Sequence, residues 1–114
     1  MDTSLSIKVH KEYNFSVIEI SGDLDAFTCE KLHDVIAGFI DGGGKNLIVN
    51  MAKIKYIDSS GLGTLVGGLR RMGESGGLLI ICEANAQVLK VFNITGLNKV
   101  FALYESQEEA ISSL

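Results

Sequence analysis

The sequence has no proline, no tryptophan and only two cysteines. Because Cys29 and Cys82 stand alone and far apart, they form no metal-ligand pattern, and we expect both to be small buried or half-buried hydrophobic residues. No internal repeat, low-complexity stretch or linker is present either. These absences argue against a metal centre and against a chain of several domains.

Long apolar runs and an excess of positive charge are absent as well. No apolar run approaches about 18 residues, so we expect no membrane span. Residues 1–10 hold no basic region followed by an apolar block, so we expect no signal peptide and a cytosolic protein. The formal net charge is −4 without a basic stripe, which argues against nucleic acid as a partner.

Apolar residues make up 46% of the 114 positions, which is enough for one hydrophobic core. We therefore expect a single domain over residues 1–114. Five segments favour strands: 5–10, 15–21, 46–51, 76–83 and 99–104. Four segments favour helices: one within 23–44 that glycines 42–44 stop, then 61–73, 86–92 and 106–114.

The predicted element order is β-β-α-β-α-β-α-β-α. Strands that alternate with helices after a leading hairpin predict an α/β domain. Its sheet is expected to be mixed but mostly parallel, opened by the N-terminal β-hairpin and covered by helices. In the first strand we expect Leu5, Ile7 and Val9 to face the core.

Several residues mark the expected helix ends. Asp25 or Thr28 is expected to cap the first helix. Gly73 is expected to end the second. Ser106 and Glu109 have the spacing of a capping box at the start of the last helix.

The most informative stretch is YIDSSGLGTLVGGLRRM, residues 56–72. After Gly61 the apolar residues fall at helical spacing and form one stripe: Leu62, Leu65, Val66, Leu69 and Met72. Asp58, Ser59 and Ser60 then lie in the turn between a strand-like approach and this helix. Open α/β sheets place their functional sites at such turns.

Three interpretations of the two serines stay open. One serine can be a plain helix cap, since a helix start leaves four N–H groups without partners. A cap needs only one such residue, so the other hydroxyl stands near the positive end of a helix. That position favours an added negative charge such as a phosphate.

A catalytic nucleophile is the third and weaker interpretation, because a serine nucleophile needs a base within reach. The sequence places His10 on the first strand and His33 in the first helix, and we expect both to be solvated. DSSGLG is not the G-x-S-x-G elbow, and the segment lacks the lysine of a phosphate-binding loop.

Four glycines crowd the same helix: Gly61, Gly63, Gly67 and Gly68. Each costs up to about 1 kcal/mol against alanine in a helix interior. A sequence that accepts this cost needs close approach of another backbone or group. Either the glycines pack against the sheet, or they leave an exposed face flat enough for a partner, and both uses stay open.

The stretch at 56–72 resembles the signature of anti-anti-sigma factors, the small stand-alone members of the STAS domain family. DSSGLG is its specific part. ISGDLDAFTCEKL at 20–32 is similar to the segment before the family's first helix. NLIVNMAKIKYIDSSGLG at 46–63 is similar to its third strand and phosphorylation loop, and VLKVFNITGLNKVF at 88–101 to its ending, so the likeness extends over nearly the whole chain.

The resemblance implies a single STAS domain that works by switching partners. The unphosphorylated protein binds an anti-sigma factor that is also a serine kinase, and so frees a sigma factor. The kinase phosphorylates the serine directly after the aspartate, which is Ser59 here, and a PP2C-type phosphatase restores the protein. No enzyme activity, cofactor or metal is implied.

The resemblance also implies a partner surface around Ser59. Asp23 and Asp25 match an acidic pair near the partner, although helix capping explains Asp25 equally well. Asp58 either caps or braces its turn, or it orients Ser59 for the kinase or contacts the partner, and Thr28 is expected to be structural. The residues expected to contact a partner are Asp23, Asp25, Asp58, Ser60, Gly61, Gly63, Thr64 and Gly67.

Two other functions remain as alternatives. The chain can be a STAS module of a partner-switching pathway without a sigma factor, or of a stress-sensing complex. An enzyme such as a nucleotide hydrolase is disfavoured, because the sequence shows no catalytic lysine, no metal-ligand cluster and no base near the serines. Whether the chain is a monomer or a weak dimer stays open.

Overall fold

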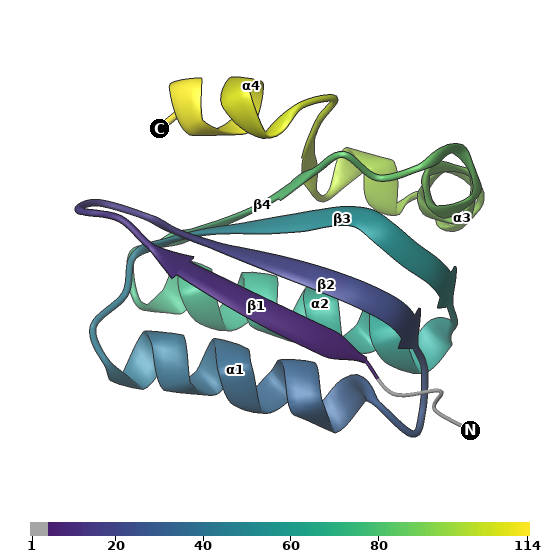
Figure 1. Ribbon diagram of the computed structural model, residues 1–114, viewed down its shortest axis with the longest axis horizontal. Coiled ribbons are helices and arrows are strands. Elements are labelled where there is room, and N and C mark those ends of the chain that lie inside the picture. The colour runs from purple at the N-terminus through teal and green to yellow at the C-terminus, as the bar shows by residue number, and fades with distance from the viewer. Residues whose placement is uncertain (1–4) are drawn as a thin grey trace.

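The computed structural model describes residues 5–114 and shows one five-stranded sheet (Figure 1). The strands lie side by side in chain order: β1 (Ser6–Lys11), β2 (Ser16–Leu24), β3 (Asn46–Ile57), β4 (Leu78–Cys82) and β5 (Ala102–Tyr104). β1 pairs with β2 antiparallel, and the remaining neighbours pair in parallel. The prediction of a mixed, mostly parallel sheet opened by a hairpin is confirmed.

Within the described range, four helices follow the strands as the sequence predicts: α1 (Cys29–Asp41), α2 (Ser59–Glu74), α3 (Ala86–Thr95) and α4 (Gln107–Ser112). A short 3-10 helix, η1 (Leu97–Lys99), was not predicted. α1 and α2 cover one face of the sheet, and α3 and α4 lie on the other (Figure 1). Among residues 5–114, no helix has the length and apolar character needed to cross a bilayer. The expectation that residues 1–10 carry no signal peptide concerns, in part, residues outside the described range.

The main core lies between the sheet and the layer formed by α1 and α2. Leu32 and Ile36 from α1 and Leu65 and Met72 from α2 are each at most 1% exposed. Burying one such side chain contributes about 1.5–3 kcal/mol. A second, smaller core under α4 contains Val17, Ile48, Ile80, Cys82 and Ala110. The two cores hold the sheet from both sides, and this fixes the ends of its strands.

The two cysteines belong to this packing, as expected. Cys82 is buried and Cys29 is half-buried, and both are free thiols. Burial, with a smaller effect of the neighbouring Glu83 carboxylate, raises the pKa of the Cys82 thiol to about 12.

β3 is longer than the segment expected at 46–51. It runs through residue 57 as one strand of 12 residues. Its register with β2 shifts twice, between Glu19 and Ser21 and again between Gly22 and Asp23. Because of these two irregularities, the buried positions Met51, Ile54 and Ile57 follow one another at intervals of three rather than two. The spacing of two between core-facing residues that marks a strand therefore stops at Met51, where the sequence predicted the end of the strand.

The expected bounds of α2 and of the last strand also need correction. α2 begins at Ser59, before Gly61, and continues past Gly73 to residue 74, and the chain reverses at Gly76 with φ +82°. The last strand was expected from residue 99, but β5 spans only 102–104 because η1 occupies residues 97–99. Gly96, with φ +77°, ends α3 and begins η1.

Val9 lies on the α1 side of β1, as expected, but it is only partly covered there. Leu5 is fully buried and Ile7 half-buried, but Val9 is 52% exposed. β1 is the outer strand of the sheet, and a groove of about 230 Å³ opens where Val9 faces Val35 and Phe39 of α1.

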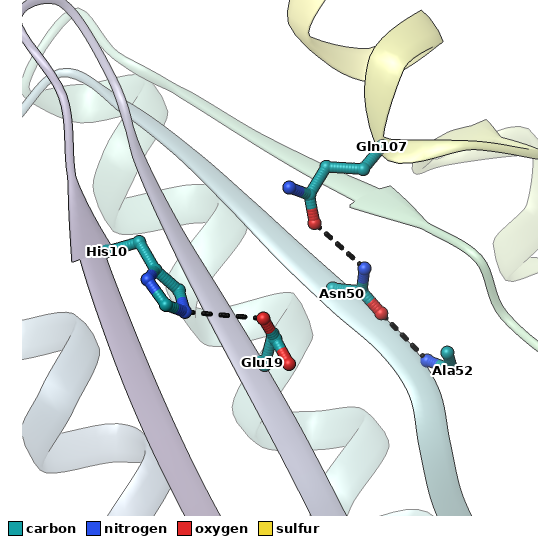
Figure 2. Close-up of polar contacts among 5 residues, drawn as sticks. All are labelled: His10, Glu19, Asn50, Ala52 and Gln107. Carbon is teal, nitrogen blue, oxygen red and sulfur yellow. Dashed lines mark hydrogen bonds and ion pairs between the residues drawn. The ribbon is translucent and has the colours of Figure 1, made fainter.

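The face of the sheet opposite α1 and α2 carries polar side chains beside α4 (Figure 2). His10 Nε2 lies 3.2 Å from Glu19 Oε2, and both histidines are exposed as expected. Asn50 donates from Nδ2 to Gln107 Oε1 at 2.9 Å and accepts at Oδ1 from the Ala52 N–H at 3.0 Å. The amide pair ties α4 to β3.

Candidate functional site

The candidate site lies at the carboxyl ends of β2 and β3, where two loops lead into α1 and α2. Both helices begin at this end of the sheet (Figure 1). The two loops are joined, because the Asp58 N–H donates to the Leu24 carbonyl oxygen at 3.2 Å. The residues that the sequence singles out on both loops therefore share one edge of the molecule.

Asp58 is the cap of α2. Its backbone is extended, with φ −118° and ψ −172°, and its Oδ1 accepts from the N–H groups of Ser60 at 2.9 Å and Gly61 at 3.1 Å. Two of the orphan donors of the helix start are thereby satisfied. The interpretation that a serine caps this helix is wrong, and the interpretation that Asp58 braces the turn is confirmed.

Ser59 is the first residue of α2 and is exposed. Within residues 5–114, its hydroxyl forms no hydrogen bond, whereas Ser60 is half-buried and its carbonyl accepts from Thr64 Oγ1 at 3.0 Å. The N-terminal end of a helix of 16 residues carries a positive partial charge. An accessible hydroxyl in that position can accept a phosphate from another protein without breaking a contact of the fold.

The four glycines of α2 divide between the two uses that the sequence left open. A Cβ on Gly61 would lie 2.6 Å from the Leu24 carbonyl oxygen, and one on Gly68 would lie 3.0 Å from Ile36 Cδ1. A Cβ on Gly63 or Gly67 would meet nothing within 4 Å. The buried pair lets α2 pack closely against β2 and α1, and the other pair leaves the outer surface of α2 flat.

This flat surface borders a groove between α1 and α2 of about 340 Å³. Its lining residues are His33, Ile36, Ser60, Gly63, Thr64, Gly67, Gly68 and Arg71. Four residues of the expected partner surface, Ser60, Gly63, Thr64 and Gly67, are thus brought together. Gly61 is buried against Leu24, and its position is explained by packing.

His33 lies closer to the serines than its place in the sequence indicates, because it borders the same groove as Ser60. Its Nδ1 is 3.4 Å from Asp34 Oδ1. Between residues 5 and 114, no hydrogen bond joins His33 to Ser59 or Ser60, and no group of three metal-ligating side chains is found.

The loop before α1 is held by Asp25 and Thr28. Asp25 Oδ1 accepts from the N–H groups of Phe27 at 2.9 Å and Thr28 at 3.2 Å. The Thr28 hydroxyl donates to the Asp23 carbonyl at 2.7 Å and accepts from the Asp25 N–H at 3.0 Å. Neither side chain caps α1 as expected: Thr28 holds the N-cap position without a capping hydrogen bond, and Asp25 binds N–H groups of the turn before the helix. Thr28 is buried and structural as predicted.

Sequence reasoning missed Phe27. The side chain is 93% exposed, although it lies among the apolar residues that precede α1. Its spacing is the signal that could have found it, because Phe27 falls outside the stripe of Leu32, Ile36 and their neighbours on α1.

Comparison with known proteins agrees with this arrangement. The sequence model of the STAS domain matches residues 6–110. An anti-sigma-B factor antagonist of Staphylococcus epidermidis is 30% identical over 105 residues, which cover 92% of this chain and 97% of that protein. The unphosphorylated form of the anti-sigma factor antagonist SpoIIAA superposes with a TM-score of 0.81 at 25% identity and 95% coverage of both chains.

A second solved structure is the phosphorylated form of the Bacillus cell fate determinant SpoIIAA. It superposes with a TM-score of 0.75 at 26% identity, covering 95% of this chain and 98% of that one. Together with the fold and the loop before α2, these similarities show that the chain belongs to the STAS domain family, among its anti-sigma factor antagonists, which are regulators and not enzymes.

Proposed function

We propose that this chain binds an anti-sigma factor that is also a serine kinase, and that phosphorylation of Ser59 by this kinase ends the binding. The unphosphorylated form sequesters the anti-sigma factor and so releases a sigma factor. A PP2C-type phosphatase removes the phosphate and restores the active form. Relatives named as anti-sigma factor antagonists, one of them known in a phosphorylated form, support the proposal.

The observation that carries this proposal is that Asp58, and not Ser59, caps α2. Because Asp58 caps α2, the Ser59 hydroxyl has no structural duty and is exposed at the helix tip. A kinase can reach this hydroxyl, and replacing its proton by the phosphoryl group of ATP, with ADP as the leaving group, leaves the cap in place.

The surface proposed for the partner extends from this tip along α2. It comprises Ser60, Gly63, Thr64 and Gly67, which border the groove between α1 and α2. Asp23, Asp25 and Asp58 lie half-buried at the same edge and give the surface an acidic end. The bare backbone at Gly63 and Gly67 lets a partner approach α2 closely.

A phosphate on Ser59 acts at this interface by charge. It adds about −1.5 to −2 charges at pH 7 next to Asp58. Docking the partner would then require removing water from a dianion, which costs several kcal/mol unless a cation pairs with it. Since about 1.4 kcal/mol changes an affinity tenfold, one phosphate suffices to end binding without refolding the chain.

The test mixes the full chain with each purified anti-sigma factor serine kinase encoded in the source genome, together with Mg²⁺ and ATP. We expect one kinase to bind the unphosphorylated chain and to transfer one phosphate, which peptide mass spectrometry places on Ser59. Calorimetry then shows binding at least about 100-fold weaker for the phosphorylated chain, with an unchanged circular dichroism spectrum. Treatment with a PP2C-type phosphatase restores the affinity.

Two variants separate the neighbouring serines. Ser59→Ala is expected to bind the kinase but to take no phosphate, and Ser60→Ala is expected still to take one. Equal affinity of the two forms of the wild-type chain, or a phosphate on another residue, contradicts the proposal.

A further inference from the structure

Phe27 is an aromatic side chain held almost completely in solvent. It is 93% exposed, and it precedes α1 at the edge where Ser59 also lies. An apolar side chain this exposed adds almost nothing to the stability of the fold, because it buries almost no surface. A single exposed apolar residue is ordinary on a protein surface, so what distinguishes Phe27 is its position: its loop is joined to the loop of Ser59 through the bond from the Asp58 N–H to the Leu24 carbonyl.

The loop that carries Phe27 is rigid. The Phe27 N–H donates to Asp25 Oδ1, and the Cys29 and Thr28 N–H groups donate to the Asp25 carbonyl at 2.8 and 3.2 Å. Thr28, which follows directly, is buried. The backbone on both sides of the aromatic ring is therefore fixed before any partner arrives, which lowers the entropy that binding must overcome.

The loop is also fixed relative to Ser59. Leu24, at the end of β2, accepts from the Asp58 N–H, and its carbonyl oxygen lies so close to Gly61 that no side chain fits there. The backbone that leads to Phe27 and the backbone that leads to Ser59 are thus joined at one point. A protein that covers Ser59 at this edge meets the Phe27 loop beside it.

We propose that Phe27 is the apolar anchor by which the partner kinase recognises this chain, inserting into an apolar pocket of that kinase; this rests on the proposed function of Ser59. Aromatic anchors at the centre of an interface supply much of its binding energy. The pocket that accepts Phe27 is expected to have a basic rim, because Asp23 at the end of β2 and Asp25 in the loop closely precede Phe27.

Tyr13 provides a matched control. Its side chain is fully exposed, like that of Phe27, but it lies in the turn between β1 and β2, at the other end of β2. Truncating either aromatic ring removes the same kind of exposed apolar surface. Only the change at Phe27 alters the proposed docking edge.

The experiment measures binding of Phe27→Ala and Tyr13→Ala to the anti-sigma factor kinase by calorimetry. We expect Phe27→Ala to bind about 30-fold more weakly, which corresponds to about 2 kcal/mol, and Tyr13→Ala to bind like the wild type. With the kinase and ATP, Phe27→Ala is expected to raise the KM for phosphorylation of Ser59 at nearly unchanged kcat, and Phe27→Tyr to recover most of the affinity.

Three outcomes overturn the inference, and they are distinct from a failure of the proposed function. If the wild type binds and is switched by phosphate on Ser59 but Phe27→Ala binds equally well, Phe27 is not the anchor. If Phe27→Ala and Tyr13→Ala weaken binding equally, the effect is general. If Phe27→Ala converts a dimer to a monomer in light scattering and leaves kinase binding intact, the ring docks a second copy. If no kinase binds the wild type, both proposals fall together.

Discussion

At the scale of single residues, the site depends on which of three adjacent side chains does which task. Asp58 caps the helix, Ser59 points its hydroxyl to solvent, and Ser60 is half-buried beside the groove. A carboxylate accepts from the first N–H groups of a helix as well as a hydroxyl does, and it adds a favourable charge at that end. Its presence leaves the serine free for modification.

The capping role of Asp58 predicts a stability effect. Asp58→Ala leaves the N–H groups of Ser60 and Gly61 without their partner and is expected to lower the free energy of unfolding by about 1 kcal/mol. Ser59→Ala, at the next position, is expected to change it by less than about 0.5 kcal/mol. Urea denaturation of both variants checks this, and a larger loss for Ser59→Ala would show that the hydroxyl contributes to the fold.

The sequence predicted only part of the division of roles among Asp58, Ser59 and Ser60. Asp58 was one of several possible caps, because Asp, Ser and Asn all perform this role and the sequence places three of them in a row. Phe27 escaped notice because its hydropathy alone does not tell an exposed aromatic ring from a buried one, although its spacing places it outside the apolar stripe of α1. Local hydrogen bonds of Asp25 and Thr28 hold the turn in which it is exposed.

At the scale of elements, α2 combines two kinds of glycine. Gly61 and Gly68 face the interior and permit close packing, while Gly63 and Gly67 face open space. The helical period predicted the stripe of apolar residues correctly, since Leu62, Leu65 and Met72 are buried. It could not assign the glycines, because a residue without a side chain gives no signal of the side it faces.

The two kinds of glycine predict opposite responses to alanine. Gly61→Ala places a Cβ 2.6 Å from a backbone oxygen that cannot move aside, so we expect a loss of stability of about 1–3 kcal/mol. Gly63→Ala meets no atom within 4 Å and is expected to raise stability by up to about 1 kcal/mol, because alanine favours helix.

Thermal unfolding and kinase binding of both variants test this contrast. Under the proposed function, Gly63→Ala should weaken binding even though it stabilises the chain, since the added methyl group stands on the docking surface. A destabilised Gly63→Ala, or a Gly61→Ala as stable as the wild type, would contradict the assignment.

The strands show where period-based reasoning stops. Alternation predicted the hairpin and the central strands, because these segments have one or two buried faces. In β3 two register shifts move the buried positions from a spacing of two to a spacing of three, so the strand-like stretch before Asp58 could not be recognised as a continuation of the strand expected at 46–51. An irregularity of pairing cannot be read from one strand alone.

At the scale of the whole molecule, the order of elements and the α/β class followed from the sequence. What the sequence left undetermined was proximity across the fold. His33 and Ser60 are distant in the chain but border one groove, and Leu24 joins the loops of Phe27 and Ser59. Such neighbours arise from the parallel packing of α1 and α2 and have no local signature.

Cys82 reports on the integrity of the whole domain. It is buried beneath α4, and its pKa is raised to about 12 from an ordinary value of 9.0. The unfolded chain therefore ionises this thiol at a lower pH than the folded chain does. As pH rises from about 9 towards 12, this residue lowers the free energy of unfolding by up to about 1.4 kcal/mol per pH unit.

Iodoacetamide labelling at about pH 9 checks whether the folded chain keeps the Cys82 thiol protonated and protected, because only the thiolate reacts. In a Cys29→Ala variant, labelling of Cys82 is expected to be slow in the native chain and to speed up as urea populates the unfolded state. A Cys29-only variant, Cys82→Ala, is expected to label sooner because Cys29 is half-buried. Fast labelling of Cys82 in the native chain would mean that α4 opens by itself.

The bare backbone along Gly63 and Gly67 has a consequence for cells that contain several such antagonists. If this surface docks the kinase as proposed, its main-chain atoms offer nearly the same shape whatever the surrounding sequence, so they give little means of telling one cognate kinase from another. The specificity that keeps parallel signalling pathways apart must then come from a few protruding side chains around the margin of this glycine surface. Changing that margin, with the glycine surface untouched, is the economical route by which duplicated copies would lose cross-talk.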